Sequence, residues 1–174
     1  MTADDPDPVL SDVAAAAGIG ARGDRASAAR LLDGLWQRIG GVAGDPLRRC
    51  AVAHALADVQ DDPRLALQWD LRALAAGSLV DDDGAAAAGL AGSAAALLPS
   101  LHLNVADGYF RTGDVPAALR HVAAGLAALP MLPDDGYAAM VREGLLRVGE
   151  EADPDHGRTA RDDSGPGRPT VPPG

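Results

Sequence analysis

The sequence contains a single cysteine, Cys50, and no lysine, and aromatic residues make up only 3% of it. One cysteine excludes a disulfide framework and a cysteine-rich zinc site. The scarcity of aromatic residues disfavours a β-sandwich or β-barrel, whose strands are enriched in aromatic and β-branched side chains. All 15 basic residues are arginines, 25 residues are acidic, and the formal net charge is −10. We therefore expect no nucleic-acid partner, because binding a phosphate backbone needs a basic patch.

Signals for secretion and membrane insertion are also missing. The N-terminus reads MTADDPDP, which is acidic where a signal peptide would be basic. Residues 84–106 carry no Asp, Glu or Arg, but they are mostly Ala and Gly, which contribute little to the free energy of membrane insertion. The sequence predicts a cytoplasmic protein with no membrane partner. Its bias toward Ala, Gly, Arg, Pro and Asp indicates a GC-rich bacterial genome.

Apolar residues recur at helical spacing along most of the chain, and no run alternates as a strand would. Asp24 and Asp114 each precede such an apolar stripe and are expected to act as N-caps. The Asp-Pro pairs at 45–46 and 62–63 combine an N-cap with proline at the first helical position. This pattern predicts an all-α fold in which short turns join consecutive helices.

The chain divides into one helical domain and two tails. Residues 9–151 are predicted to form about seven helices, with Ser11 capping the first and an Ala-rich helix spanning 84–98. Residues 1–8 and 152–174 are predicted to be disordered, since segments so poor in apolar residues cannot offset their ordering entropy. Helix pairs of this kind cannot bury both apolar faces alone, so we predict a short α-solenoid of stacked antiparallel helix hairpins.

Residues 99–130 have the best-defined pattern of small and large side chains. An aliphatic-small pair and an aromatic residue mark the first helix, a Gly-Asp turn follows, and small residues recur where two helices would cross. The positions that carry this pattern are Val105, Ala106, Tyr109, Gly113, Asp114, Ala118, Val122, Gly125 and Pro130. The unit resembles a tetratricopeptide repeat (TPR), with His102 where the family prefers tryptophan. Residues 46–77 match the pattern more weakly.

The resemblance implies a concave groove lined by the first helix of each hairpin. Asn104, Asp107, Phe110 and Arg111 would face this groove and contact a ligand. Asn104 can bond a peptide backbone, Arg111 can pair with a carboxylate, and Phe110 can supply apolar contact. An acidic groove favours a neutral or basic segment. We therefore expect a TPR-like protein- or peptide-binding adaptor that is not an enzyme and uses no cofactor.

Alternative hypotheses rest on other residues. His54 and Asp58 are four apart on a predicted helix, a spacing that can present an imidazole and a carboxylate to a metal ion or small molecule. A homodimer formed by exposed ends of the helix array is a further hypothesis. The glycine pattern at 18–23 resembles a dinucleotide-binding loop, but no strand precedes it. Cys50 is expected to be a small buried hydrophobe, although its arginine neighbours leave a nucleophilic role open.

Overall fold

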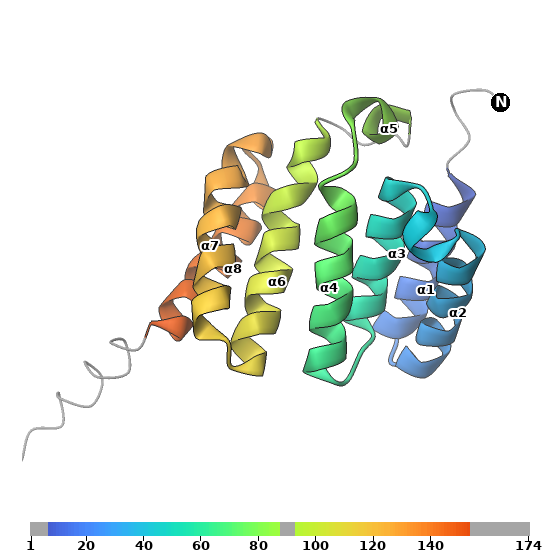
Figure 1. Cartoon of the computed structure of the whole chain (residues 1–174), viewed down its shortest axis with the longest axis horizontal. Helices are drawn as coiled ribbons and strands as arrows, with labels where there is room; N and C mark the ends of the chain where they lie inside the picture. The colour runs from blue at the N-terminus through green and yellow to red at the C-terminus, as the bar shows by residue number, and fades with distance from the viewer. Residues whose placement is uncertain (1–6, 88–92, 154–174) are drawn as a thin grey trace, which may run out of the picture.

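The computed structural model describes residues 7–87 and 93–153, and these form an all-α stack of helices (Figure 1). The α-helices are α1 (Pro8–Ala21), α2 (Arg25–Arg38), α3 (Pro46–Asp58), α4 (Pro63–Gly77), α5 (Asp82–Ala87), α6 (Leu98–Thr112), α7 (Val115–Ala128) and α8 (Gly136–Ala152). Short 3₁₀ helices cover Gly41–Ala43, Ala94–Leu97 and Leu129–Met131. No strand occurs in these two described ranges.

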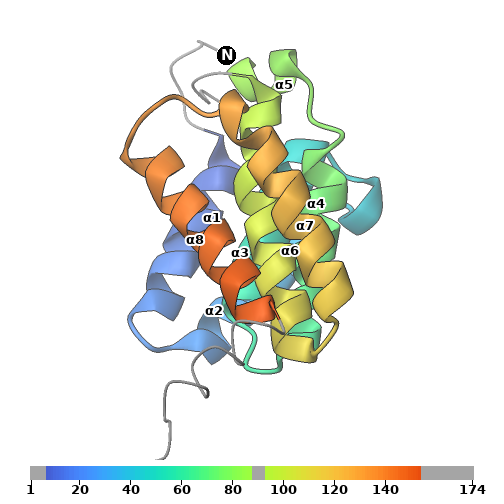
Figure 2. The ribbon, with the colours of Figure 1, turned by 90° about the vertical axis from the view of Figure 1, so that its left-hand side faces the viewer.

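Three antiparallel hairpins follow one another along the stack: α1 with α2, α3 with α4, and α6 with α7. Helix α3 packs against both α1 and α2, α4 packs on α6, and α8 closes the stack against α6 and α7. Figure 1 shows α1 and α2 at one end, and Figure 2 views the other end, where α7 and α8 lie nearest the reader. The predicted α-solenoid of stacked hairpins is confirmed.

Aspartate caps begin most of the long helices, as the sequence predicts. The side chains of Asp24, Asp45, Asp62 and Asp114 each accept a hydrogen bond from a backbone N–H in the first turn of the following helix. Each cap of this kind contributes about 1 kcal/mol to helix stability. Gly113 ends α6 with a φ of 90°, a left-handed conformation that favours glycine. These caps fix the residues at which the helices begin and end, and so determine the positions of the turns between them.

The cap of the first helix differs from the prediction. Asp7, rather than Ser11, caps α1: its Oδ1 accepts a hydrogen bond from the Val9 amide at 2.8 Å. Ser11 lies inside the helix, which begins at Pro8, one residue before the predicted domain start. Burial alone would raise the pKa of the Asp7 carboxyl, but hydrogen bonds from Arg48 and two backbone amides outweigh it and hold that pKa below its usual value.

The predicted Ala-rich helix over 84–98 is not one continuous helix. Residues 88–92 lie outside the described part of the chain, and α5 precedes them. Ser93 has extended backbone angles, φ −83° and ψ 156°, which interrupt any helix running through it. The Asp82 side chain accepts a hydrogen bond from the Ala94 amide at 2.8 Å and so ties the two sides of this connection together.

Apolar side chains fill the space within and between the hairpins. Leu32, Leu56 and Leu145 are among the largest fully buried side chains. Small residues let neighbouring helices approach closely, and Gly125 of α7 is the clearest case. A Cβ added to Gly125 would lie 2.7 Å from Cδ2 of Leu145 in α8. Because that separation is shorter than van der Waals contact, glycine at this position sets the distance between α7 and α8.

The two predicted tails lie largely beyond the described residues, at 1–6 and 154–174. Helix α8 ends one residue later than the predicted domain boundary, at Ala152, whose side chain is buried. Of the helices in the described ranges, none combines the length and the apolar content needed to cross a membrane.

Candidate functional site

A polar cleft lies where three helices from the middle of the stack meet its last helix. It encloses about 250 Å³ and is lined by side chains of α3, α4, α6 and α8. The lining residues are Asp58, Ala66, Asp70, Leu103, Asn104, Asp107, Gly108, Arg111 and Arg147. Both α3 and α6 are the first helices of their hairpins, which are the helices expected to line a concave groove. The cleft therefore includes residues of two helices that the TPR resemblance would place along a groove.

Three of the four predicted groove residues meet in this cleft. Asn104, Asp107 and Arg111 all line it from α6. The fourth, Phe110, does not: its ring packs against the buried cluster that includes Ala106. The reason is helix geometry, because Phe110 lies four residues after Ala106 and so shares its core-facing side of α6. Phe110 thus supports the packing of α6 and supplies no apolar contact to the cleft.

Asn104 is held in place by a contact between two hairpins. Its Nδ2 lies 3.1 Å from Nδ1 of His54 in α3, within hydrogen-bonding distance. The other ring nitrogen of His54 lies 3.9 Å from Oδ2 of Asp58, one helical turn further on. This chain of polar contacts fixes the amide of Asn104 at the cleft wall. Among the residues of the described part, no group of three or more His, Cys, Asp or Glu side chains is placed to hold a metal ion.

Asp107 lies within ion-pair distance of two arginines. Of the other cleft carboxylates among the described residues, Asp58 approaches only His54, and Asp70 approaches no basic side chain within that distance. Its two oxygens lie 3.9 Å from Nη1 of Arg111 and 3.9 Å from Nη2 of Arg147. Arg147 also reaches Glu151 at 3.3 Å. Both arginine side chains are about half exposed, so these long contacts contribute little to stability. The guanidinium groups can therefore turn toward a bound carboxylate or carbonyl at small cost.

Asp70 of α4 is the most unusual residue in the cleft. It is 8% exposed and lines the cleft, yet it makes no hydrogen bond or ion pair to any described residue. Burial raises the pKa of the Asp70 carboxyl to about 7, and the nearby carboxylates of Asp58 and Asp107 push it in the same direction, while Arg111 opposes them. A buried carboxylate without a partner costs several kcal/mol when ionised.

The sequence contains a signal that would have found Asp70. The weaker repeat aligns with the better one so that Ala66 and Ala73 match Ala118 and Gly125. In this alignment Asp70 takes the place of Val122, which is buried. A carboxylate at a repeat position that elsewhere carries a core side chain predicts a buried charge.

The structure also places the residues of the other sequence hypotheses. Cys50 is buried among alanines and Leu101, and burial raises the pKa of its thiol to about 11, which keeps it from acting as a nucleophile near neutral pH. The glycine pattern at 18–23 forms the end of α1 and the turn to α2, with no strand before it in the described residues. Neither region resembles a catalytic site.

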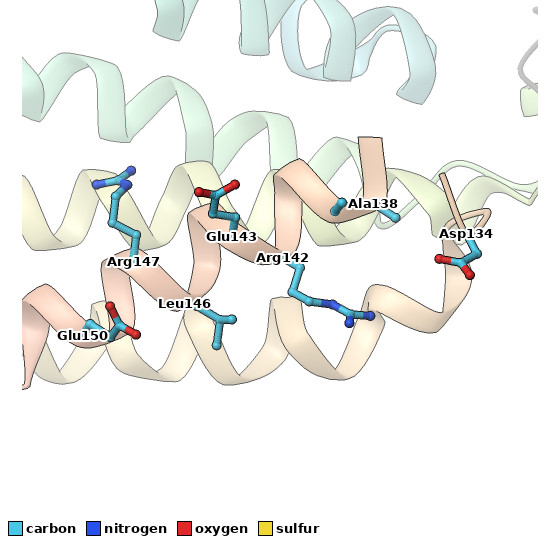
Figure 3. A pocket seen from close by; sticks show the side chains of 8 residues that line it. Asp134, Ala138, Arg142, Glu143, Leu146, Arg147 and Glu150 are labelled. Atoms are coloured by element: carbon cyan, nitrogen blue, oxygen red, sulfur yellow. The ribbon is translucent and has the colours of Figure 1, made fainter. Parts of the chain in front are cut away.

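A second concave surface lies along the exposed face of α8 (Figure 3). It encloses about 520 Å³ and is lined by α8 and the loop before it. In Figure 3, Glu143 and Arg147 point to one side of the helix, and Arg142 and Leu146 point to the other. Leu146 is 47% exposed, and Met140 on the same helix is 57% exposed. This surface is larger but is built on one helix, so we regard the four-helix cleft as the better candidate site.

No protein-family model matches the chain, and no curated protein and no solved structure matches it. The resemblance to tetratricopeptide repeats therefore depends on the residues of the chain itself.

Proposed function

We propose that this chain is a non-enzymatic protein- or peptide-binding module of the TPR-like class, with the ligand held in the four-helix cleft. The observation that carries the proposal is the meeting of Asn104, Asp107 and Arg111 with Asp58 and Asp70 in one cleft. These side chains offer hydrogen-bond donors and acceptors and charges of both signs. That mixture suits an extended peptide, whose backbone and side chains present the same groups.

The local packing also supports a binding role. The cleft crosses the junction between the α3–α4 and α6–α7 hairpins, and α8 contributes Arg147. Rigid elements from different hairpins therefore hold the polar groups, which lowers the entropy lost when a ligand binds. Stacked helix repeats build extended concave surfaces in the same way.

Binding to peptides selected from a random display library tests the proposal. The full chain is used for selection, and the affinities of the selected peptides are then measured by calorimetry for two variants. We expect Asn104→Ala combined with Arg111→Ala to weaken binding about tenfold or more, since a lost hydrogen bond to a charged group costs about 1.5–3 kcal/mol.

Arg120→Ala is the matched control. Arg120 is exposed on α7, does not line the cleft, and loses the same charge. We expect this variant to bind the selected peptides within about twofold of the wild type, a difference of about 0.4 kcal/mol. Equal losses in the control and the cleft variant, or no loss in either, would show that the cleft is not the binding site.

A further inference from the structure

Asp70 destabilises the free protein when its carboxyl is ionised, and a bound cation would offset that cost. The residue is 8% exposed, lines the cleft, and has no hydrogen-bond or ion-pair partner among the described residues. Replacing such a carboxylate by an apolar residue usually stabilises a protein. A buried charge of this kind is characteristic of functional sites, where stability is sacrificed for binding.

The charged groups around Asp70 come from three other helices. Asp58 of α3 and Asp107 of α6 are both close enough to raise the pKa of Asp70 further. Arg111 of α6 and Arg147 of α8 lie within ion-pair distance of Asp107 and not of Asp70, although the charge of Arg111 partly offsets the negative charge around Asp70. His54 of α3, the remaining titratable group at this wall, contacts Asn104 and Asp58. Asp70 therefore has no ion-pair partner of its own, and the two neighbouring carboxylates outweigh Arg111 in their effect on it.

We infer that this cleft recognises a cationic side chain of the bound peptide, a guanidinium or an ammonium group, with Asp70 as its main hydrogen-bond acceptor. The inference rests on the proposed peptide-binding function and specifies its ligand. A cation inserted beside Asp70 would supply the missing donors and would lie near the carboxylates of Asp58 and Asp107. Charge-assisted hydrogen bonds to a desolvated carboxylate are among the strongest contacts in protein interfaces.

The size of the cleft fits one side chain. Pockets for drug-sized ligands enclose about 300–1,000 Å³, and this cleft encloses about 250 Å³. A peptide lying across α3 and α6 could therefore insert one basic side chain while its backbone contacts Asn104. Arg111 and Arg147 line the same cleft and are available for a carbonyl or carboxylate elsewhere on the peptide.

Binding of a cation to Asp70 makes the affinity depend on pH. Burial holds the pKa of free Asp70 at about 7, and a bound cation would lower it. The peptide must therefore displace a proton from Asp70 in acid but not in mild base. Because the ionised fraction falls about tenfold between pH 8 and pH 6, the affinity is expected to fall by about the same factor.

The experiment compares charged and neutral versions of the same peptides. Each peptide that depends on the cleft is resynthesised with arginine replaced by citrulline, or lysine by acetyl-lysine, and its affinity is measured by calorimetry at pH 6 and pH 8. In each peptide, we expect one basic residue whose replacement weakens binding at pH 8 by tenfold or more. Asp70→Asn should cause a similar loss and remove the pH dependence, whereas Asp33→Asn on the exposed face of α2 should change neither.

The outcomes separate this inference from the proposed function. Peptides that need Asn104 and Arg111 but bind equally well with citrulline or acetyl-lysine would overturn the inference and leave the peptide-binding function standing. Unchanged affinity and pH dependence in Asp70→Asn would overturn it as well. If no selected peptide depends on the cleft residues, both the function and the inference fail.

Discussion

At the scale of the residue, Asp70 links stability to pH even without a ligand. A carboxyl whose pKa is raised on folding stabilises the folded state while it is protonated, and this contribution is lost as pH rises toward the folded-state pKa of about 7. The cost of ionised Asp70 is thus absent at pH 4 and complete above pH 7. An increase from the usual aspartate pKa to about 7 corresponds to roughly 4 kcal/mol at most.

We predict that Asp70→Asn raises the free energy of unfolding at pH 8 by about 2–4 kcal/mol and changes it little at pH 4, because asparagine has no charge to desolvate. Urea unfolding of the full chain at the two pH values, followed by circular dichroism, measures the difference. Asp33→Asn, an exposed change of the same chemistry, should shift neither value. A variant less stable than the wild type at pH 8 would show that Asp70 has a partner that stabilises its charge.

Single residues were only partly predictable from the sequence. Asn104, Asp107 and Arg111 line the cleft because the repeat pattern fixes which face of α6 is exposed. Phe110 was assigned to the same face, but an aromatic side chain next to that face turns toward apolar neighbours. Hydrophobic periodicity identifies apolar residues in a core and does not indicate that Asp70 is buried, whereas the alignment of the two repeats does.

At the scale of the element, the α6–α7 hairpin contains two histidines in contact with each other. The Nδ1 atoms of His102 and His121 lie 3.0 Å apart, and the His121 ring stacks on Tyr109 with the ring centroids 5.5 Å apart. Burial lowers the pKa of His102, and burial together with the charges of His102 and Arg120 lowers the pKa of His121. As the pH falls, these two histidines therefore take up protons at a higher pH in the unfolded chain than in the folded hairpin.

We predict that His121→Phe makes the protein less sensitive to acid. For histidines with a lowered pKa, stability is present above the ordinary histidine pKa near 6.5 and is lost as pH falls below it. Phenylalanine keeps the contact with Tyr109 and binds no proton. The free energy of unfolding, measured in urea, should fall less for the variant than for the wild type as the pH is lowered from 7 to 5. A difference that is independent of pH would mean that His121 titrates normally.

Helix boundaries could be predicted where a cap marks them. Four aspartate caps were identified because an acceptor before an apolar stripe has a direct physical role. The pair Asp7-Pro8 has the same form as the later Asp-Pro pairs and caps α1, but Ser11 is also a residue type common at N-caps, so residue type alone does not decide between them. The segment 84–98 contains several glycines as well as Ser93, and the sequence does not indicate which of these residues interrupts the helix.

At the scale of the whole molecule, the stack follows from helices that each bury a face against the preceding and following hairpin. The sequence predicted this because the hairpin turns recur and the helices between them are amphipathic. It could not predict that Leu67 of α4 would pack close to Gly108 of α6, or Leu145 of α8 close to Gly125. Those contacts depend on how far each helix is rotated, which a one-dimensional pattern leaves undetermined.

Replacing glycine by alanine should have opposite effects at two positions, because only one of the two glycines lies where helices pack closely. Gly34 of α2 has open space around it, so Gly34→Ala should raise the free energy of unfolding by about 0.5–1 kcal/mol through helix propensity. At Gly125 the new Cβ would meet Leu145 at 2.7 Å and Cβ of His102 at 3.2 Å, and Leu145 is fully buried. Gly125→Ala should therefore lower the free energy of unfolding by about 1–3 kcal/mol.

Urea unfolding measures both glycine effects, and hydrogen exchange locates them. Because each hairpin packs mainly against its neighbours within the described residues, Gly125→Ala should speed exchange in α7 and α8 much more than in α1 and α2. Equal acceleration in every helix would mean that the chain unfolds as one cooperative unit. Stabilisation by Gly125→Ala would mean that α8 can move away from α7, and the cleft that depends on Arg147 of α8 would then have no fixed shape.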